Sequence, residues 1–195
     1  MNLSRYFTLA ELTFSRTAAA ERIDNTPADA ERSNLGALCT SVLDPLRDAA
    51  GAAIKVTSGY RGPVLNARVR GERKSQHLEG KAADIQPTTM SVLELFKTVV
   101  RLALPFDQLI YENKSATSKW VHVSHDPATN RGQILLAHFL PTGKVERYEP
   151  FDPEAGSPEL EAMLLQAVTG PHTPYSKKDL EAVAAKVKRE LLDGY

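Results

Sequence analysis

A long segment punctuated by glycine and proline, residues 59–80, constrains the fold of this chain more than any other feature. It separates two short runs with the composition of β-strands, Ala53–Ser58 and Lys81–Gln86. An irregular stretch of this length is uncommon inside a compact domain and is usually functional. We therefore expect a functional loop held between two strands. The residues that interrupt regular structure are Gly59, Gly62, Pro63, Gly71 and Gly80.

Helical patterns flank this loop in the sequence. The capping-box spacing in Thr8–Glu11 and in Ser91–Glu94 predicts a helix at each position. Between them, apolar residues recur at helical spacing within residues 26–51, which predicts one long amphipathic helix with a kink at Pro45.

Three strand-like runs follow the helix predicted after Ser91. They are Phe106–Glu112, Lys119–Ser124 and Gln133–Leu140, and polar residues 113–118 suit a hairpin loop between the first two. The pattern predicts an antiparallel meander. The expected fold class is therefore α+β, a small antiparallel sheet with flanking helices.

The composition changes after residue 140. Six of the twelve prolines lie in the last 55 residues, where Ser176–Asp179 begins a well-signalled final helix. We expect two parts: residues 1–140 as the functional domain, and residues 141–195 as a proline-rich linker followed by helices.

The charge balance and the single cysteine exclude several classes of protein. The chain has 24 Lys and Arg against 24 Asp and Glu, so it lacks the basic footprint of a nucleic-acid-binding protein. Cys39 has no second cysteine for an intrachain disulfide and falls on an apolar helical stripe, where we expect it buried.

The N-terminal residues do not have the pattern of a secretory signal. Arg5, Glu11 and Arg16 interrupt every apolar stretch that could serve as one, so we expect the chain to be cytoplasmic when synthesised. No run of about 18 apolar residues occurs, and no membrane span is expected.

Two histidines and an aspartate have the composition of a catalytic zinc site. His77 and Asp84 are followed 38 residues later by His122, and such a ligand set leaves a fourth position open for water. On one helix His77 and Asp84 would lie about 10 Å apart, too far to share an ion. Gly80 supplies the freedom for a turn between them.

Strand alternation supports this arrangement, although another interpretation stays open. If the two strands are neighbours, Asp84 and His122 lie on one face of the sheet, opposite Ile85, Val121 and Val123. Taken singly, however, His77 is as compatible with a flexible loop, Asp84 with a turn cap, and His122 with a half-buried strand position.

Several separated motifs together resemble a known family. In order along the chain, the motifs are Ser58-Gly-Tyr-Arg61, Ser75-x-His77-x-x-Gly80-x-Ala82-x-Asp84 and Trp120-x-His122. The resemblance is to the zinc D-Ala-D-Ala carboxypeptidases (peptidase family M15), particularly their phage and prophage members. It covers residues 2 to about 140 and includes the opening Leu3–Leu12 segment.

The resemblance implies a fold, a metal and a substrate. It implies the fold shared by hedgehog domains and DD-peptidases, with His77, Asp84 and His122 binding zinc. Arg61 would contact the substrate or the transition state. The implied substrates are peptidoglycan stem peptides, acted on after phage lysis or from within a virion.

One position departs from the family pattern. Better-known members have an acidic catalytic residue three positions before the last histidine ligand, and here that position is Lys119. Glu112, at the end of the preceding strand, is the nearest acidic candidate, and a hairpin would bring it near His122. Its alternative is a solvated charge at a strand end.

The remaining candidates are weaker. His125 is a possible third ligand in place of His122, although strand alternation points it to the other face. Ser75 and Gln76 are candidates for contacting the substrate or orienting a ligand, or simply for solvating the loop. The arginines and Lys74 of the loop could recognise carboxylates or form an ordinary charged surface. His138 and His172 match no motif.

The sequence therefore predicts a zinc peptidase that hydrolyses an amide bond in peptidoglycan stem peptides, as a D-Ala-D-Ala carboxypeptidase or an endolysin-type endopeptidase. Glu112 would be the general base and Arg61 the second catalytic group. The alternative is a non-catalytic wall-binding or structural phage component that retains the zinc-peptidase fold.

Overall fold

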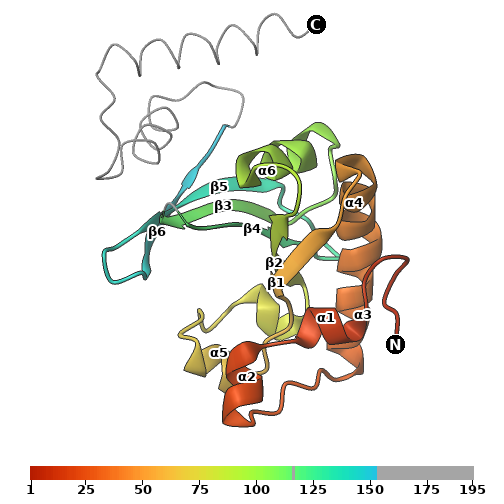
Figure 1. Ribbon diagram of the computed structural model, residues 1–195, viewed down its shortest axis with the longest axis vertical. Helices are drawn as coiled ribbons and strands as arrows, with labels where there is room; N and C mark the ends of the chain where they lie inside the picture. Colours follow the sequence, from red (N-terminus) through yellow and green to blue (C-terminus); the bar gives the residue numbers. More distant parts are fainter. Residues whose placement is uncertain (116, 153–195) are drawn as a thin grey trace, which may run out of the picture. The chain divides into compact units, whose positions relative to one another are not determined.

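The computed structural model of the protein describes residues 1–115 and 117–152 (Figure 1). Within these residues the fold is α+β, as predicted, and helices pack beside one mixed sheet. The helix predicted from Ser176 and His172 lie outside the described residues. The division of the chain into a functional domain and a C-terminal part stays a prediction.

The sheet is larger than the small antiparallel sheet that the sequence predicts. In the described part it has six strands in the order β1-β2-β4-β3-β5-β6, and every neighbouring pair is antiparallel except β3 and β5. The predicted antiparallel meander is wrong for β5: because β2 and β3 occupy both edges of β4, β5 does not pair with β4 but lies at the other edge of β3 and runs parallel to it. The strands are β1 (Ile54–Ser58), β2 (Ala82–Pro87), β3 (Gln108–Ser115), β4 (Ser118–Ser124), β5 (Gln133–Phe139) and β6 (Val145–Pro150).

Strand β6 corrects the prediction that a linker begins at residue 141. The chain turns at Gly143, whose φ is +78°, and β6 then pairs with β5. Phe151, directly after β6, is buried against the rings of Phe96 and Tyr111. The strand was missed because half of the residues in Val145–Pro150 are charged and the segment lacks apolar alternation.

The long helix predicted for residues 26–51 is three consecutive helical segments. They are α3 (Asp29–Leu38), the π-helical turn η1 (Cys39–Leu43) and α4 (Asp44–Ala50). Pro45 has no N–H to donate to the preceding turn, and a π turn is one way in which a helix accommodates that loss. Cys39 is fully buried, as predicted.

The other helices are short. Both predicted capping boxes cap a helix: Thr8 accepts from the backbone N–H of Glu11, and Ser91 accepts from that of Glu94. The helices are α1 (Leu9–Thr13), α2 (Arg16–Glu21), α5 (Pro63–Arg68), the 3-10 helix η2 (Gln76–Glu79) and α6 (Val92–Arg101).

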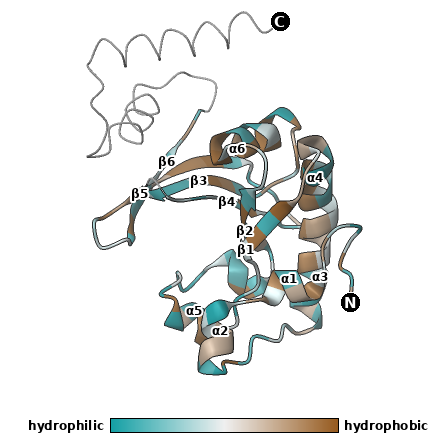
Figure 2. Ribbon diagram, in the orientation of Figure 1, coloured by the Kyte–Doolittle hydropathy of each residue, from teal (hydrophilic) through white to brown (hydrophobic). Residues whose placement is uncertain are grey.

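The two faces of the central strands differ in what covers them. Helix α6 packs on β2, β3 and β4 and buries the apolar face, which includes Ile85, Val121 and Val123. Figure 2 shows hydrophobic residues on these strands and on α4 and α6. The opposite face, where alternation places Asp84 and His122, borders a cleft of about 730 Å³.

Candidate active site

Three potential metal ligands converge at the floor of this cleft. The ligand atoms of His77, Asp84 and His122 all lie within 4.8 Å of one another, so these side chains could hold a metal ion. Asp84 Oδ1 is 3.0 Å from His122 Nδ1 and 3.3 Å from His77 Nε2. The geometry thus brings together the three residues that the sequence singled out.

Two neighbouring strands and one turn produce this convergence. Asp84 on β2 is directly opposite His122 on β4, and directly opposed residues share a face of a sheet. His77 reaches the same place from η2, which ends at Gly80 with a φ of +66°. Gly80 therefore supplies the turn predicted between His77 and Asp84.

The hydrogen bonding of His77 fixes which nitrogen faces the cluster. Its Nδ1 lies 2.6 Å from the Gly59 carbonyl oxygen, so Nδ1 carries the proton and donates. Nε2 then presents a lone pair to the carboxylate of Asp84. This lone pair also lies 3.2 Å from His122 Nδ1, and it would be available to a metal ion.

The pKa shifts of the cluster fit metal ligation. Burial lowers the pKa of His77 and keeps its imidazole neutral. Burial alone would raise the pKa of Asp84, but the neighbouring His77 and His122 outweigh it and lower that pKa. A neutral imidazole and an ionised carboxylate are the forms that bind a metal ion.

Glu112 lies on the same face as the cluster. Glu112 on β3 is directly opposite Trp120 on β4, which comes two residues before His122. Glu112 is only 8% exposed. Burial, followed by the negative charge of Asp84, raises the pKa of Glu112 to about 7. It is thus a buried carboxyl with a perturbed pKa, not a solvated charge at a strand end.

Lys119, at the position where better-known relatives have an acid, is not a lining residue of the cleft. Strand alternation points the Lys119 side chain to the face of the sheet opposite that of His122. The backbone carbonyl of Lys119 accepts a hydrogen bond from the Gln86 side chain. Its positive charge therefore does not occupy the place of a catalytic carboxylate.

Two side chains beside His77 have buried polar atoms without partners in the described part of the chain. Arg61 lines the cleft, and its Nε has no hydrogen-bond acceptor. Gln76 donates to Asp107, but its Oε1 accepts no hydrogen bond. Ser75 also lines the cleft.

Asp107 and Arg131 bind each other beside Gln76, an arrangement that was not predicted from the sequence. Arg131 donates to Asp107 from its backbone N–H and from its guanidinium, and the guanidinium lowers the pKa of that carboxyl to about 2. Asp107 in turn orients Gln76. No spacing in the sequence links these positions, because they meet only where the end of β4, the start of β3 and the turn before β5 come together.

The cleft is lined by more cations than anions. The loop contributes Arg70 and Lys74 as expected, whereas Arg68 instead pairs with Glu21. Its acidic lining residues are Glu72, Asp84 and Glu112. The basic ones are Arg61, Arg70, Lys74, Lys114, Arg131 and Lys144.

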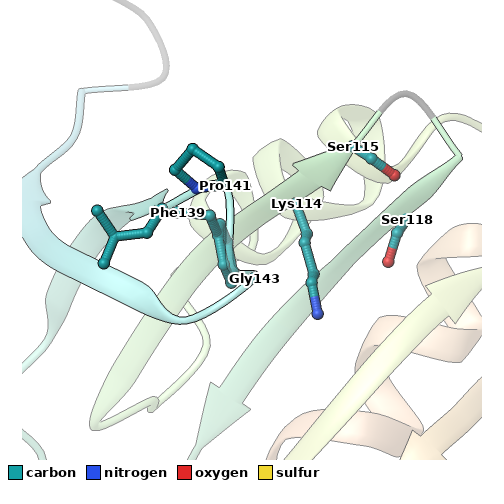
Figure 3. A pocket seen from close by; sticks show the side chains of 7 residues that line it. Lys114, Ser115, Ser118, Phe139, Pro141 and Gly143 are labelled. Atoms are coloured by element: carbon teal, nitrogen blue, oxygen red, sulfur yellow. The ribbon is translucent and has the colours of Figure 1, made fainter.

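Residues after 140 also line the cleft, although this segment was predicted to be a linker. They are Thr142 to Val145 and Tyr148, from the β5–β6 turn and β6. A second hollow of about 450 Å³ shares Lys114, Phe139 and Gly143 with the cleft and continues toward Ser115 and Ser118 (Figure 3).

The other two histidines in the described part of the chain are not part of the cluster. His125 is buried with Nδ1 2.6 Å from the Pro105 carbonyl oxygen, which directs that nitrogen to the backbone. His138 pairs with Glu149 at 2.7 Å. Neither is among the described residues whose ligand atoms converge with those of Asp84.

Comparison with known protein families identifies the chain. The family model described as Peptidase M15 matches residues 5–124, more than half of the sequence. The chain belongs to this peptidase family. The match contains all three potential metal ligands and Glu112, and it ends before β5 and β6. A search of curated proteins found no match. Among the described residues, no helix is long and apolar enough to cross a membrane.

Proposed function

We propose that this protein is a zinc peptidase that hydrolyses an amide bond in peptidoglycan stem peptides and has the hedgehog/DD-peptidase fold. One observation carries the proposal: the ligand atoms of His77, Asp84 and His122 converge next to a buried glutamate, in a chain of a peptidase family. Two imidazoles and a carboxylate with an open position are typical of catalytic rather than structural zinc.

The residues of this chain divide the work as follows. When bound, zinc lowers the pKa of a water molecule and polarises the scissile carbonyl. Glu112, buried on the same face as the metal ligands, accepts the proton of the attacking water and delivers it to the leaving amine. Arg61 donates to the substrate carboxylate or to the developing oxyanion.

The charge of the cleft supports an anionic peptide substrate. Six basic and three acidic side chains line it, and arginine forks bind carboxylates well. Stem peptides carry free carboxylates, whereas a segment of an ordinary unfolded protein has none at most positions. We propose that the protein reaches the cell wall after phage lysis or as part of a virion.

Digestion of purified peptidoglycan fragments, followed by mass spectrometry, tests the proposal. The zinc-loaded protein is expected to release D-alanine, as a carboxypeptidase, or to cut an internal stem-peptide bond, as an endopeptidase. Chelation should abolish the products, and unfolded casein should be a poor substrate. A zinc-loaded protein that cuts no stem peptide but sediments with cell walls would instead support the non-catalytic component.

A further inference from the structure

Tyr148 lies on the site face of the sheet although it is outside the family match. Consecutive pairs cross the sheet in register: Trp120 with Glu112, Glu112 with Ala137, and Ala137 with Tyr148. Directly opposed residues project to the same face. Tyr148 therefore lies in the same row as Glu112, two strands away.

The residue between them has a small side chain. Ala137 on β5 is buried and has only a methyl side chain. With strands about 4.8 Å apart, the Cα atoms of Glu112 and Tyr148 are about 10 Å apart across this alanine. Both residues line the cleft, so the phenol ring forms a wall of the space in which Glu112 would act.

The charged groups that act on Tyr148 lie on several elements around the site. Burial raises the pKa of Tyr148 to about 12, and the negative charges of Glu112, Glu72 and Asp84 add to this effect, while Arg61 opposes it. These groups come from the loop, from β2 and from β3. The hydroxyl therefore remains protonated at neutral pH.

The hydroxyl is also an available donor. Tyr148 is 45% exposed, and among the described residues its hydroxyl makes no hydrogen bond. By contrast, the hydroxyl of Tyr6 donates to Asp48 at 2.6 Å. A protonated donor without a partner, beside a candidate general base, can serve a group that gains negative charge during reaction.

We propose that Tyr148 is a further catalytic residue, whose hydroxyl donates a hydrogen bond to the carbonyl oxygen of the scissile amide as that oxygen becomes negative. The inference rests on the proposed peptidase function. Tyr148 keeps its proton throughout, so no bond to it is broken. With this role for Tyr148, β6 contributes to catalysis, and the site extends beyond residues 5–124, which the family model matches.

Removal of the hydroxyl alone tests this role. Tyr148→Phe should lower kcat by about 100-fold, the usual cost of one oxyanion donor, with KM and zinc content unchanged. Tyr6→Phe removes the same atom far from the cleft, and Glu149→Gln changes the next residue of β6, which faces the other side of the sheet. Both controls should retain wild-type kcat. Wild-type kcat in Tyr148→Phe, or an equal fall in the Tyr6→Phe control, would overturn the inference.

A tetrahedral phosphinate analogue of the stem dipeptide separates this inference from the proposed function. Transition-state analogues report contacts made only during reaction, so Tyr148→Phe should bind the phosphinate about 100-fold more weakly by calorimetry. If the wild type binds it but cleaves no stem peptide, the proposed function fails, and equal affinity in Tyr148→Phe overturns the role of Tyr148. A wild type that neither cleaves nor binds overturns both.

Discussion

His77 illustrates how a single residue is prepared for its role. The Gly59 carbonyl fixes the proton on Nδ1, and Nε2 is left to face Asp84 and His122. The motif could be found in the sequence because its spacing is local, whereas this tautomer could not, because Gly59 lies 18 positions away and meets His77 only in the fold.

The metal ligands give the first prediction. His77→Ala or Asp84→Ala should abolish stoichiometric zinc binding, because either change leaves two ligands and an incomplete site. Elemental analysis of purified protein measures the content. His125→Ala is the control and should retain about one zinc per chain. Zinc retained by both ligand variants would refute the assignment.

Glu112 gives a second prediction at this scale. Glu112→Gln should keep zinc and fold but lower turnover of a stem peptide by about 100- to 10,000-fold, the usual contribution of a general base. Lys119→Ala, on the opposite face of β4, should change turnover less than threefold or so. A fully active, zinc-loaded Glu112→Gln variant would place the base elsewhere.

The raised pKa of Glu112 also predicts a pH dependence of stability in the metal-free protein. A carboxyl with a pKa of about 7 when folded and about 4.3 when unfolded binds its proton more tightly in the folded state. Its stabilising contribution is complete below pH 4 or so and is lost as the pH rises through 7. Between pH 5 and 8 it should fall by about 2–3 kcal/mol.

Urea unfolding at pH 5 and pH 8 measures this change. From pH 5 to pH 8, the unfolding free energy of the metal-free wild type should fall by about 2–3 kcal/mol more than that of Glu112→Gln, which has no carboxyl to titrate at this position. Parallel pH profiles for the two proteins would show that Glu112 is not buried as described.

At the scale of elements, the turn between η2 and β2 decides whether the site can form. Gly80 has a positive φ, and a Cβ there would lie 2.5 Å from the Glu31 carbonyl oxygen. Gly80→Ala should therefore reduce the unfolding free energy by about 3 kcal/mol and weaken zinc binding, because His77 must shift.

Gly51→Ala is the matched control for this substitution. Gly51 has a similar φ of +61°, but no atom lies within 4 Å of its added Cβ. It should cost only about 1 kcal/mol, the backbone part of the penalty, and leave zinc affinity unchanged. Equal effects of the two substitutions would show that the close approach to Glu31 is unimportant.

The elements show why sequence predicted one part of the site and missed another. In β2 and β4 apolar residues alternate with polar ones, so the shared face of Asp84 and His122 could be predicted. Strand β6 has no such alternation, because it is an edge strand whose pairing depends on β5. Its contribution of Tyr148 to the cleft was therefore hidden.

At the scale of the whole molecule, the described residues contain every group that we assign to the chemistry. A chain that ends at residue 155 should therefore retain zinc and hydrolyse stem peptides at close to the full rate. A chain that ends at residue 140 lacks Tyr148 and the buried ring of Phe151, and it should lose both activity and stability. Initial rates and thermal unfolding of the two proteins measure this. A folded but inactive 1–155 chain would show that residues 156–195 are needed for the reaction.

Titration of zinc into the metal-free protein, with the rate of stem-peptide cleavage as the readout, tests the central claim most directly. The arrangement of His77, Asp84 and His122 provides one site, so the rate should rise linearly to one zinc per chain and then remain constant. Full activity in the metal-free protein, or no cleavage at any zinc content, would contradict the account.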